Sequence, residues 1–381
     1  MTVRLHEAAA RRIAVIRTSA LGDTVLATPV LRALHARWPA AEIHLITAGA
    51  FAPLFDGLPF VHRVWRWEPH SRHAGVRGLA RFAAELREAG PFDLGIDLQN
   101  KVRTRVLLGL LAPARRFTFV KRAGLAAVAR ALAGSDEVID RGPAAALYLE
   151  ALAALELPAA DLRPQIVVPP AADAAAARLL EGVDGPLVAL APGARWALKR
   201  WPPARFAQVG DALAAVGARI VLAGGPGDRA ELDAVRAAMQ TRPVGDTAGL
   251  DVAGLAAVLA RSAVLVTCDS APSHLAQAVG TPVVAVFGPT SSRRWGPLPG
   301  AGTAVSLPLA CAPCSNHGRG GCPLGHHACL EDLPAETVTA AAIAALRAGR
   351  QAGGAAAEAA SRQQLVPLAA RVARADREIF R

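Results

Sequence analysis

Short runs of apolar, often β-branched residues alternate with longer helical stretches along almost the whole chain, and this alternation limits the fold more than any other feature. Strands that alternate with helices in this way indicate parallel sheets covered by helices on both faces. The predicted strands are Ile13–Ile16, Glu42–Thr47, Val61–Trp65, Phe92–Leu98, Arg116–Val120, Leu187–Ala191, Ala218–Ala223, Ala263–Thr267 and Val283–Phe287. The predicted helices are Thr24–Arg37, Val76–Glu88, Val102–Leu111, Pro203–Val216, Asp228–Met239, Val252–Ala260 and Ser273–Val279.

The 381 residues are enough for two domains, each with its own core. A proline-containing, irregular stretch at 157–170 separates the two sets of strands and predicts a linker that extends to about residue 186. The sequence therefore predicts an α/β protein with two Rossmann-like, doubly wound parallel-sheet domains at 11–170 and 184–346, facing a cleft. Residues 347–381 form a basic tail rich in Ala and Arg, for which packing, membrane contact and a free state all stay open.

Composition narrows the class of protein. Apolar residues make up 52% of the chain, which excludes full disorder. The net charge of +11 reflects either a genome that favours Arg or an anionic partner, and no nucleic-acid-binding motif accompanies it, so no nucleic acid is expected. The first apolar run, Ile13–Ile16, is too short for a signal peptide, and no apolar window approaches the ~18 residues of a membrane span. A cytoplasmic protein is expected.

Ligands of open parallel sheets bind at the carboxyl ends of the strands, so the loops there are the first places to look for chemistry. The loop after the first strand contains Ser19, Gly22 and Asp23. Gly22 allows a tight turn close to a ligand. Asp23 is either the N-cap of the following helix or a general base that takes a proton from a hydroxyl group.

A cationic loop and a helix start predict a phosphate site in the second domain. Lys199, one of three lysines in the chain, lies in the loop after Leu187–Ala191, and its ammonium suits a phosphate oxygen. The segment 269–274, with Asp269, Ser270, Ala271 and His274, follows a strand and opens a helix whose free N–H groups suit an anion. Asp269 would repel a diphosphate unless a cation such as Lys199 lies between them. The alternatives are an N-cap for Asp269 and a satisfied core residue for His274.

A glycine-rich turn, Gly224-Gly225-Pro226-Gly227, precedes Asp228. An acid beside such a turn can bind ribose hydroxyls, with Glu231 as the competing acid and a plain capped loop as the alternative.

Four cysteines, Cys311, Cys314, Cys322 and Cys329, lie close together in the sequence. Three states stay open for them: a structural tetrahedral zinc or iron, reduced thiols, or disulfides. No catalytic metal is expected, and Cys268 is predicted to be a buried core residue.

Several motifs, in order, resemble one family. They are Thr18-Ser19-Ala20-Leu21-Gly22-Asp23, Lys199-Arg200-Trp201-Pro202, Asp269-Ser270-Ala271-Pro272-Ser273-His274, Gly280-Thr281-Pro282 and Phe287-Gly288-Pro289-Thr290. Together they resemble the ADP-heptose:lipopolysaccharide heptosyltransferases of glycosyltransferase family 9, over about residues 11–345. The stretch 322–329 resembles the heptosyltransferase II branch.

The resemblance implies a GT-B fold and an inverting transfer of heptose from ADP-L-glycero-D-manno-heptose to the inner core of lipopolysaccharide, without a cofactor or catalytic metal. It implies that Asp23 is the general base, with Ser19 and Gly22 in the acceptor loop. It places Lys199 at the donor diphosphate, Asp269, Ser270, Ala271 and His274 in the donor motif, and Asp228 at the ribose. The family usually has Gly where this chain has Ala271, and a methyl group there narrows the approach of the phosphate.

Three other functions stay open at the level of sequence: a family 9 transferase with another donor or acceptor, a nucleotide-sugar epimerase of the same fold, and a relative without turnover. The glycolipid acceptor implied by the resemblance would bring the protein to the inner face of the inner membrane, where a positive net charge favours contact with anionic lipid.

Overall fold

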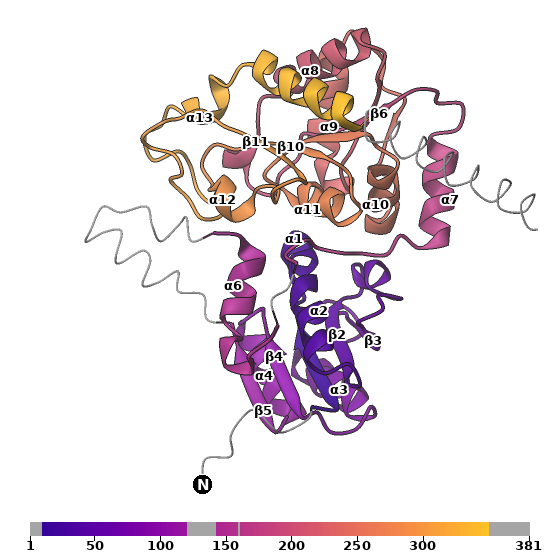
Figure 1. The fold of residues 1–381 in the computed structure, drawn as a ribbon, viewed down its shortest axis with the longest axis vertical. Helices are drawn as coiled ribbons and strands as arrows, with labels where there is room; N and C mark the ends of the chain where they lie inside the picture. Colours follow the sequence, from indigo (N-terminus) through magenta and orange to yellow (C-terminus); the bar gives the residue numbers. More distant parts are fainter. Residues whose placement is uncertain (1–9, 120–141, 159–160, 350–381) are drawn as a thin grey trace, which may run out of the picture.

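Two parallel sheets, stacked end to end along the molecule, form the framework of the protein (Figure 1). The structure, a computed structural model, describes residues 10–119, 142–158 and 161–349. The first sheet has the order β3-β2-β1-β4-β5 and the second the order β11-β10-β9-β6-β7-β8. The first strand of each half, β1 or β6, lies inside its sheet, and the following strands are added on one side of it and then on the other. The point beside this strand where the direction changes is the topological switch point of the sheet. Two parallel-sheet α/β domains were predicted, and this prediction is confirmed.

The N-terminal sheet is buried on both faces. Its strands are β1 (Arg12–Ile16), β2 (Glu42–Ala48), β3 (Arg63–Trp67), β4 (Leu94–Asp97) and β5 (Arg115–Thr118). Alternate residues of β1 join two different apolar clusters, one with Ile13 and Val15 and the other with Ala14 and Ile16. The other strands and the surrounding helices also contribute to these clusters. The helices of this half are α1 (Leu21–Val25), α2 (Thr28–Arg37), α3 (Gly75–Arg87), α4 (Val102–Leu111) and α6 (Ala144–Glu150), with the 3-10 turns η1 (Ala52–Leu54) and η3 (Ala153–Leu155).

The C-terminal sheet repeats the same plan. Its strands are β6 (Leu187–Ala191), β7 (Arg219–Leu222), β8 (Gly245–Asp246), β9 (Val264–Cys268), β10 (Val283–Val286) and β11 (Gly302–Val305). The helices are α7 (Pro170–Leu179), α8 (Pro203–Ala215), α9 (Arg229–Ala238), α10 (Val252–Ala260), α11 (Ala271–Ala278), α12 (Ser292–Trp295) and α13 (Ala328–Glu331), with η4 (Ala197–Lys199) and η5 (Pro226–Asp228). Residues 335–349 are also helical.

The two halves share buried apolar surface. The largest cluster runs from β1 and α2 through Leu54 and Phe55 to Ala256 and Val258 of α10. The connecting segment pairs with the N-terminal half, because Val167 donates its N–H to the carbonyl of Leu54 at 2.8 Å. Helix α7 then packs against α10. Residues 157–158 and 161–169 form neither helix nor strand, which confirms the irregular stretch predicted there, and α7 begins at Pro170. The domain bounds stay a prediction.

The predicted helix Thr24–Arg37 is wrong in one respect, since the structure breaks it into α1 and α2 at Leu26 and Ala27. Pro29 explains the break: it has no N–H to donate, and in a continuous helix its ring would clash with the carbonyl of Val25. The short strands β8 and β11 were missed because β8 has two residues and β11 is mostly exposed, so neither has an apolar pattern.

Within the residues that the structure describes, no helix is long and apolar enough to cross a membrane. The tail from residue 350 onward lies outside the described residues, and the prediction for it stays open.

His44, on β2, carries a buried imidazole that resists protonation. Trp65 Nε1, which can only donate, lies 3.0 Å from His44 Nδ1, so the proton of the neutral ring is on Nε2. Burial, and then the positive charge of His62, lower the pKa of His44 to about 4.

We expect His44 to make the fold sensitive to acid. The unfolded chain takes up this proton near the ordinary pKa of 6.5 and the folded chain only near about 4, so the stabilisation is complete above pH 6.5 and is lost as the pH falls toward 4. The loss should be about 2–3 kcal/mol. Urea unfolding from pH 7 to pH 4 measures it. The His44→Gln variant should lose less stability over this range, and parallel curves for both proteins would contradict the role of His44.

Candidate active site

A cleft of about 500 Å³ lies between the two domains and is lined from both sides. The N-terminal wall includes Ser19, Gly22 and Asp23, and the C-terminal wall includes Lys199, Asp228, Asp269, Ser270, Ala271 and His274. Every residue predicted for the site from the sequence therefore lies on this one cleft. The tip of α1 reaches up to α11 at its edge (Figure 1).

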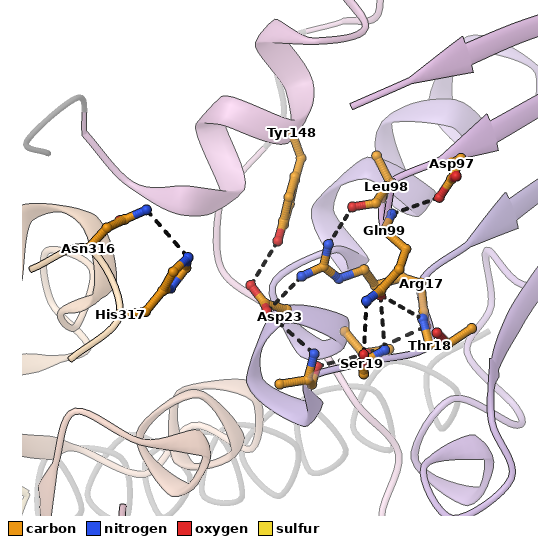
Figure 2. A network of polar contacts seen from close by, with 12 residues as sticks. Arg17, Thr18, Ser19, Asp23, Asp97, Leu98, Gln99, Tyr148, Asn316 and His317 are labelled. Carbon is orange, nitrogen blue, oxygen red and sulfur yellow. Dashed lines mark hydrogen bonds and ion pairs between the residues drawn. The ribbon is translucent and has the colours of Figure 1, made fainter. Parts of the chain in front are cut away.

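Asp23 is held by its neighbours on two sides (Figure 2). Its Oδ2 lies 2.7 Å from Nη2 of Arg17, a side chain that is 0% exposed, and its Oδ1 accepts a hydrogen bond of 3.0 Å from the hydroxyl of Tyr148. The N-cap of α1 is Ala20, and Asp23 is the third helical residue, so the alternative that Asp23 is the N-cap is wrong. Its Oδ2 still accepts from the N–H of Ala20 at 3.4 Å and so contributes to capping the start of the helix. The side chain of Asp23 is 21% exposed and faces the cleft, where a carboxylate can reach a ligand.

Gln99, which no sequence motif indicated, fixes the loop before Asp23. Its Oε1 accepts from the N–H groups of Thr18 and Ser19 at 3.2 and 3.1 Å, and its Nε2 donates to Ser19 Oγ at 2.8 Å. The buried carboxylate of Asp97 in turn accepts from the N–H of Gln99 at 2.9 Å and from Thr104 Oγ1 at 2.8 Å. This loop is therefore set by the neighbouring strand β4.

On the opposite wall, the expected pair of Lys199 and Asp269 is present. Lys199 Nζ donates to Asp269 Oδ2 at 3.0 Å, and Thr290 Oγ1 donates to the same oxygen at 2.7 Å. Both charged side chains are largely buried, at 14% and 6% exposed. An ammonium has three donors, so one bond to Asp269 orients Lys199 while other donors stay available to an anion.

The start of α11 supplies backbone donors beside this cation. Ser270 is the N-cap, so the alternative that Asp269 caps the helix is wrong. His274 is 5% exposed, and its Nδ1 has no hydrogen-bond partner among the described residues, so it is buried but not a satisfied core residue. Burial lowers the pKa of His274, against the opposing charges of Asp269 and Asp23, and keeps its ring neutral near pH 7.

Asp228 lies at the end of the glycine-rich turn and faces the same cleft. Its Oδ2 accepts from the N–H of Gly225 at 2.9 Å. A Cβ on Gly193 would lie only 2.3 Å from Asp228 Oδ1, so glycine there permits the close approach of the two loops. The competing acid, Glu231, pairs with Arg200 at 2.5 Å and does not line the cleft.

Several cleft residues were not predicted: Gln99, Lys101, Trp295, Asn316, His317 and Arg319. Trp196 also lines the cleft, with Arg319 Cζ 5.1 Å from its ring centre. Trp201, by contrast, is buried and packs against Phe206. Trp295 Nε1 donates to Asn316 O at 2.9 Å, which connects α12 to the loop that follows β11.

All five cysteines are free thiols in the structure, and Cys268 is buried as predicted. Burial, and then the charges of the three other clustered cysteines, raise the pKa of Cys329 to about 11. Three potential metal ligands converge only at Glu42, His44 and His62 within the described part of the chain, not at the thiols. His44 cannot ligate there as a neutral ring, because Nδ1 accepts from Trp65 and Nε2 holds the proton.

Comparison with known proteins decides the family. Residues 79–320 match the family model of glycosyltransferase family 9 (heptosyltransferase). The chain belongs to glycosyltransferase family 9. It is 28% identical over 283 residues to an Escherichia coli protein named lipopolysaccharide heptosyltransferase 3. The aligned region covers 72% of this chain and 83% of that protein. The family assignment makes this protein a glycosyltransferase.

Solved structures support the GT-B fold. A family 9 glycosyltransferase from Veillonella parvula aligns with a TM-score of 0.74 at 24% identity, over 91% of this chain and 98% of that one. E. coli ADP-heptose lps heptosyltransferase II aligns with a TM-score of 0.70 at 22% identity, over 89% and 99%.

The contact between the two walls of the cleft depends on Gly22. A Cβ there would lie 2.6 Å from His274 Cδ2, so in the Gly22→Ala variant either the buried His274 ring or α1 itself must shift. A displacement of about 1 Å between the walls can cost up to about 10²-fold in rate. We expect glycosyl transfer by Gly22→Ala to fall at least about tenfold, measured as kcat/KM.

The matched control is Gly109→Ala on α4, where a new Cβ meets nothing within 4 Å. It should keep full activity. Wild-type activity in Gly22→Ala would show that the two walls do not need this close contact.

Proposed function

We propose that this glycosyltransferase moves heptose from ADP-L-glycero-D-manno-heptose to the inner core of lipopolysaccharide, with inversion at the anomeric carbon. One observation supports this proposal above all: the cleft has a carboxylate, Asp23, on one wall and an oriented cation, Lys199, beside a helix start on the other. Transfer needs a base for the acceptor and positive charge for the leaving diphosphate. The names of the relatives, which include a lipopolysaccharide heptosyltransferase and an ADP-heptose transferase, support the choice of sugar and acceptor.

On the acceptor side, Asp23 takes the proton of the attacking hydroxyl. The hydroxyl oxygen forms a new bond to the anomeric carbon while the bond from that carbon to the diphosphate oxygen breaks. The electron pair of the broken bond leaves with ADP. Attack from the face opposite the leaving group inverts the anomeric configuration.

On the donor side, Lys199 and the N–H groups at the start of α11 neutralise the diphosphate as its charge grows. Ser270 and Ala271 form that start, and His274 lines it as a neutral imidazole. Asp228 binds the ribose hydroxyls. Asp269 keeps Lys199 in place through a hydrogen bond. The ammonium of Lys199 therefore already compensates the negative charge of Asp269 before the donor binds.

A lipid-anchored acceptor implies work at the cytoplasmic face of the inner membrane. The net charge of +11 supports peripheral contact with an anionic leaflet.

Replacing the base should abolish most of the turnover. With ADP-heptose and a heptose-deficient lipopolysaccharide core, wild type should release ADP only when the acceptor is present. The Asp23→Asn variant should lose about 10²–10⁴-fold in kcat, the usual contribution of a general base. ADP release and product analysis measure both.

The control is Asp56→Asn, which removes an exposed carboxylate that pairs with Arg66 and does not line the cleft. Full activity in Asp23→Asn would show that Asp23 is not the general base. If wild type does not bind ADP-heptose, the proposed donor is wrong, and other nucleotide sugars should be tested in the same assay.

Removing the cation should weaken donor use. Lys199→Met deletes the charge and leaves Asp269 buried without its partner, so kcat/KM for the donor should fall about 10–100-fold, as expected for one lost charged hydrogen bond. The control Arg205→Met removes an exposed cation from α8 of the same domain. Equal losses in both variants would indicate a general effect of charge instead of a diphosphate contact.

A further inference from the structure

Tyr148 is the only tyrosine in the chain, and the sequence gives it no role. It lies on α6, 125 residues beyond Asp23, and α6 brings its hydroxyl to the carboxylate of Asp23 (Figure 2). Its side chain is buried at 3% exposed. A buried hydroxyl needs a partner, and Tyr148 donates to the carboxylate of Asp23.

The ring of Tyr148 is fixed independently of its hydroxyl. The ring of Phe119 packs edge-on against it at 4.9 Å, and Cζ of Arg17 lies 5.3 Å from its centre. Phe119 and Arg17 therefore fix the orientation of the Tyr148 ring. In this orientation the hydroxyl points at Asp23 Oδ1.

Arg17 binds the other oxygen of the same carboxylate. It extends from the end of β1, is fully buried, and also donates through Nη1 to the carbonyl of Leu98. The two oxygens of Asp23 are thus held by different elements, Oδ2 from β1 and Oδ1 from α6. A carboxylate held at both oxygens cannot turn freely about its terminal bond.

We propose that Tyr148 is a positioning residue for the general base, whose hydroxyl holds the Asp23 carboxylate in the orientation that meets the acceptor hydroxyl. The inference rests on the proposed role of Asp23 as base. The proton of the acceptor passes to Asp23, and Tyr148 keeps its own proton throughout.

Burial, and then the charge of Asp23, raise the pKa of Tyr148, so its hydroxyl remains a donor over the working pH range. The charged and titratable groups that act on Asp23 or Tyr148 include Arg17 after β1, His274 from α11 and Arg294 from α12. Tyr148 itself donates to Asp23. Of these, only Tyr148 can be changed by the removal of a single oxygen.

The test is Tyr148→Phe, which keeps the ring and its contacts with Phe119 and Arg17. Without the hydroxyl, the carboxylate loses a donor that favours its charged form, so the acid limb of the kcat–pH profile should move upward by about one pH unit. Above that limb, kcat should fall about tenfold while the KM for ADP-heptose stays unchanged, because the donor is bound by the other wall.

The control is Leu45→Ala, which removes a buried side chain of β2 from the same apolar cluster but leaves the hydroxyl of Tyr148 and the neighbours of its ring. It should lower the melting temperature and leave the acid limb in place. A Tyr148→Phe profile that overlays wild type, or a Tyr148→Phe variant that only lowers the melting temperature as Leu45→Ala does, would overturn the inference.

Asp23→Asn separates this inference from the proposed function. If Asp23→Asn is active, the proposed base itself is wrong, and the role of Tyr148 is wrong with it. If Asp23→Asn is inactive while Tyr148→Phe matches wild type, the base stands and only the positioning role is wrong.

Discussion

The buried ion pair between Arg17 and Asp23 is the interaction on which the N-terminal half of the cleft depends. A guanidinium with no exposed surface is costly unless a charged partner and further acceptors compensate it. Asp23 supplies the charge, and the carbonyl of Leu98 accepts from the same side chain. The start of α1 must therefore lie over the end of β1, which brings a carboxylate to the edge of the sheet where ligands of this fold bind.

The C-terminal wall of the cleft contains a second ion pair, between Lys199 and Asp269, in which the cation faces the cleft. Lys199 and Asp269 are both largely buried, but the cation has donors beyond those that its partner occupies. The first pair presents a carboxylate to the cleft and the second presents an ammonium. Because the two pairs lie on separate domains, the proposed base and the proposed site for the leaving diphosphate lie on opposite walls. Gly22, pressed against His274, marks where these walls meet.

The sequence predicted the parts of the site that depend on local patterns. The loop of Asp23, the cation Lys199 and the start of α11 each follow a strand, and the carboxyl ends of parallel strands meet at one edge, so their convergence could be expected. Tyr148 and Gln99 could not be found this way. Tyr148 reaches Asp23 from 125 residues away, and Gln99 acts through an amide whose partners are the backbone of another strand's loop. No periodicity or spacing encodes such contacts; they arise from the packing of α6 and the neighbouring position of β4.

The ion pair also restricts how the proposed base can work. Once Asp23 accepts a proton, the buried guanidinium of Arg17 loses its charged partner, a change that costs about 3–5 kcal/mol for a fully buried pair. The cost is smaller here because the carboxylate is 21% exposed and partly solvated. A protonated Asp23 is therefore a high-energy state. If Asp23 is the base, it should accept the proton only as the acceptor oxygen bonds to the sugar. Loss of that proton to solvent at the partly exposed carboxylate would then restore the ion pair with Arg17.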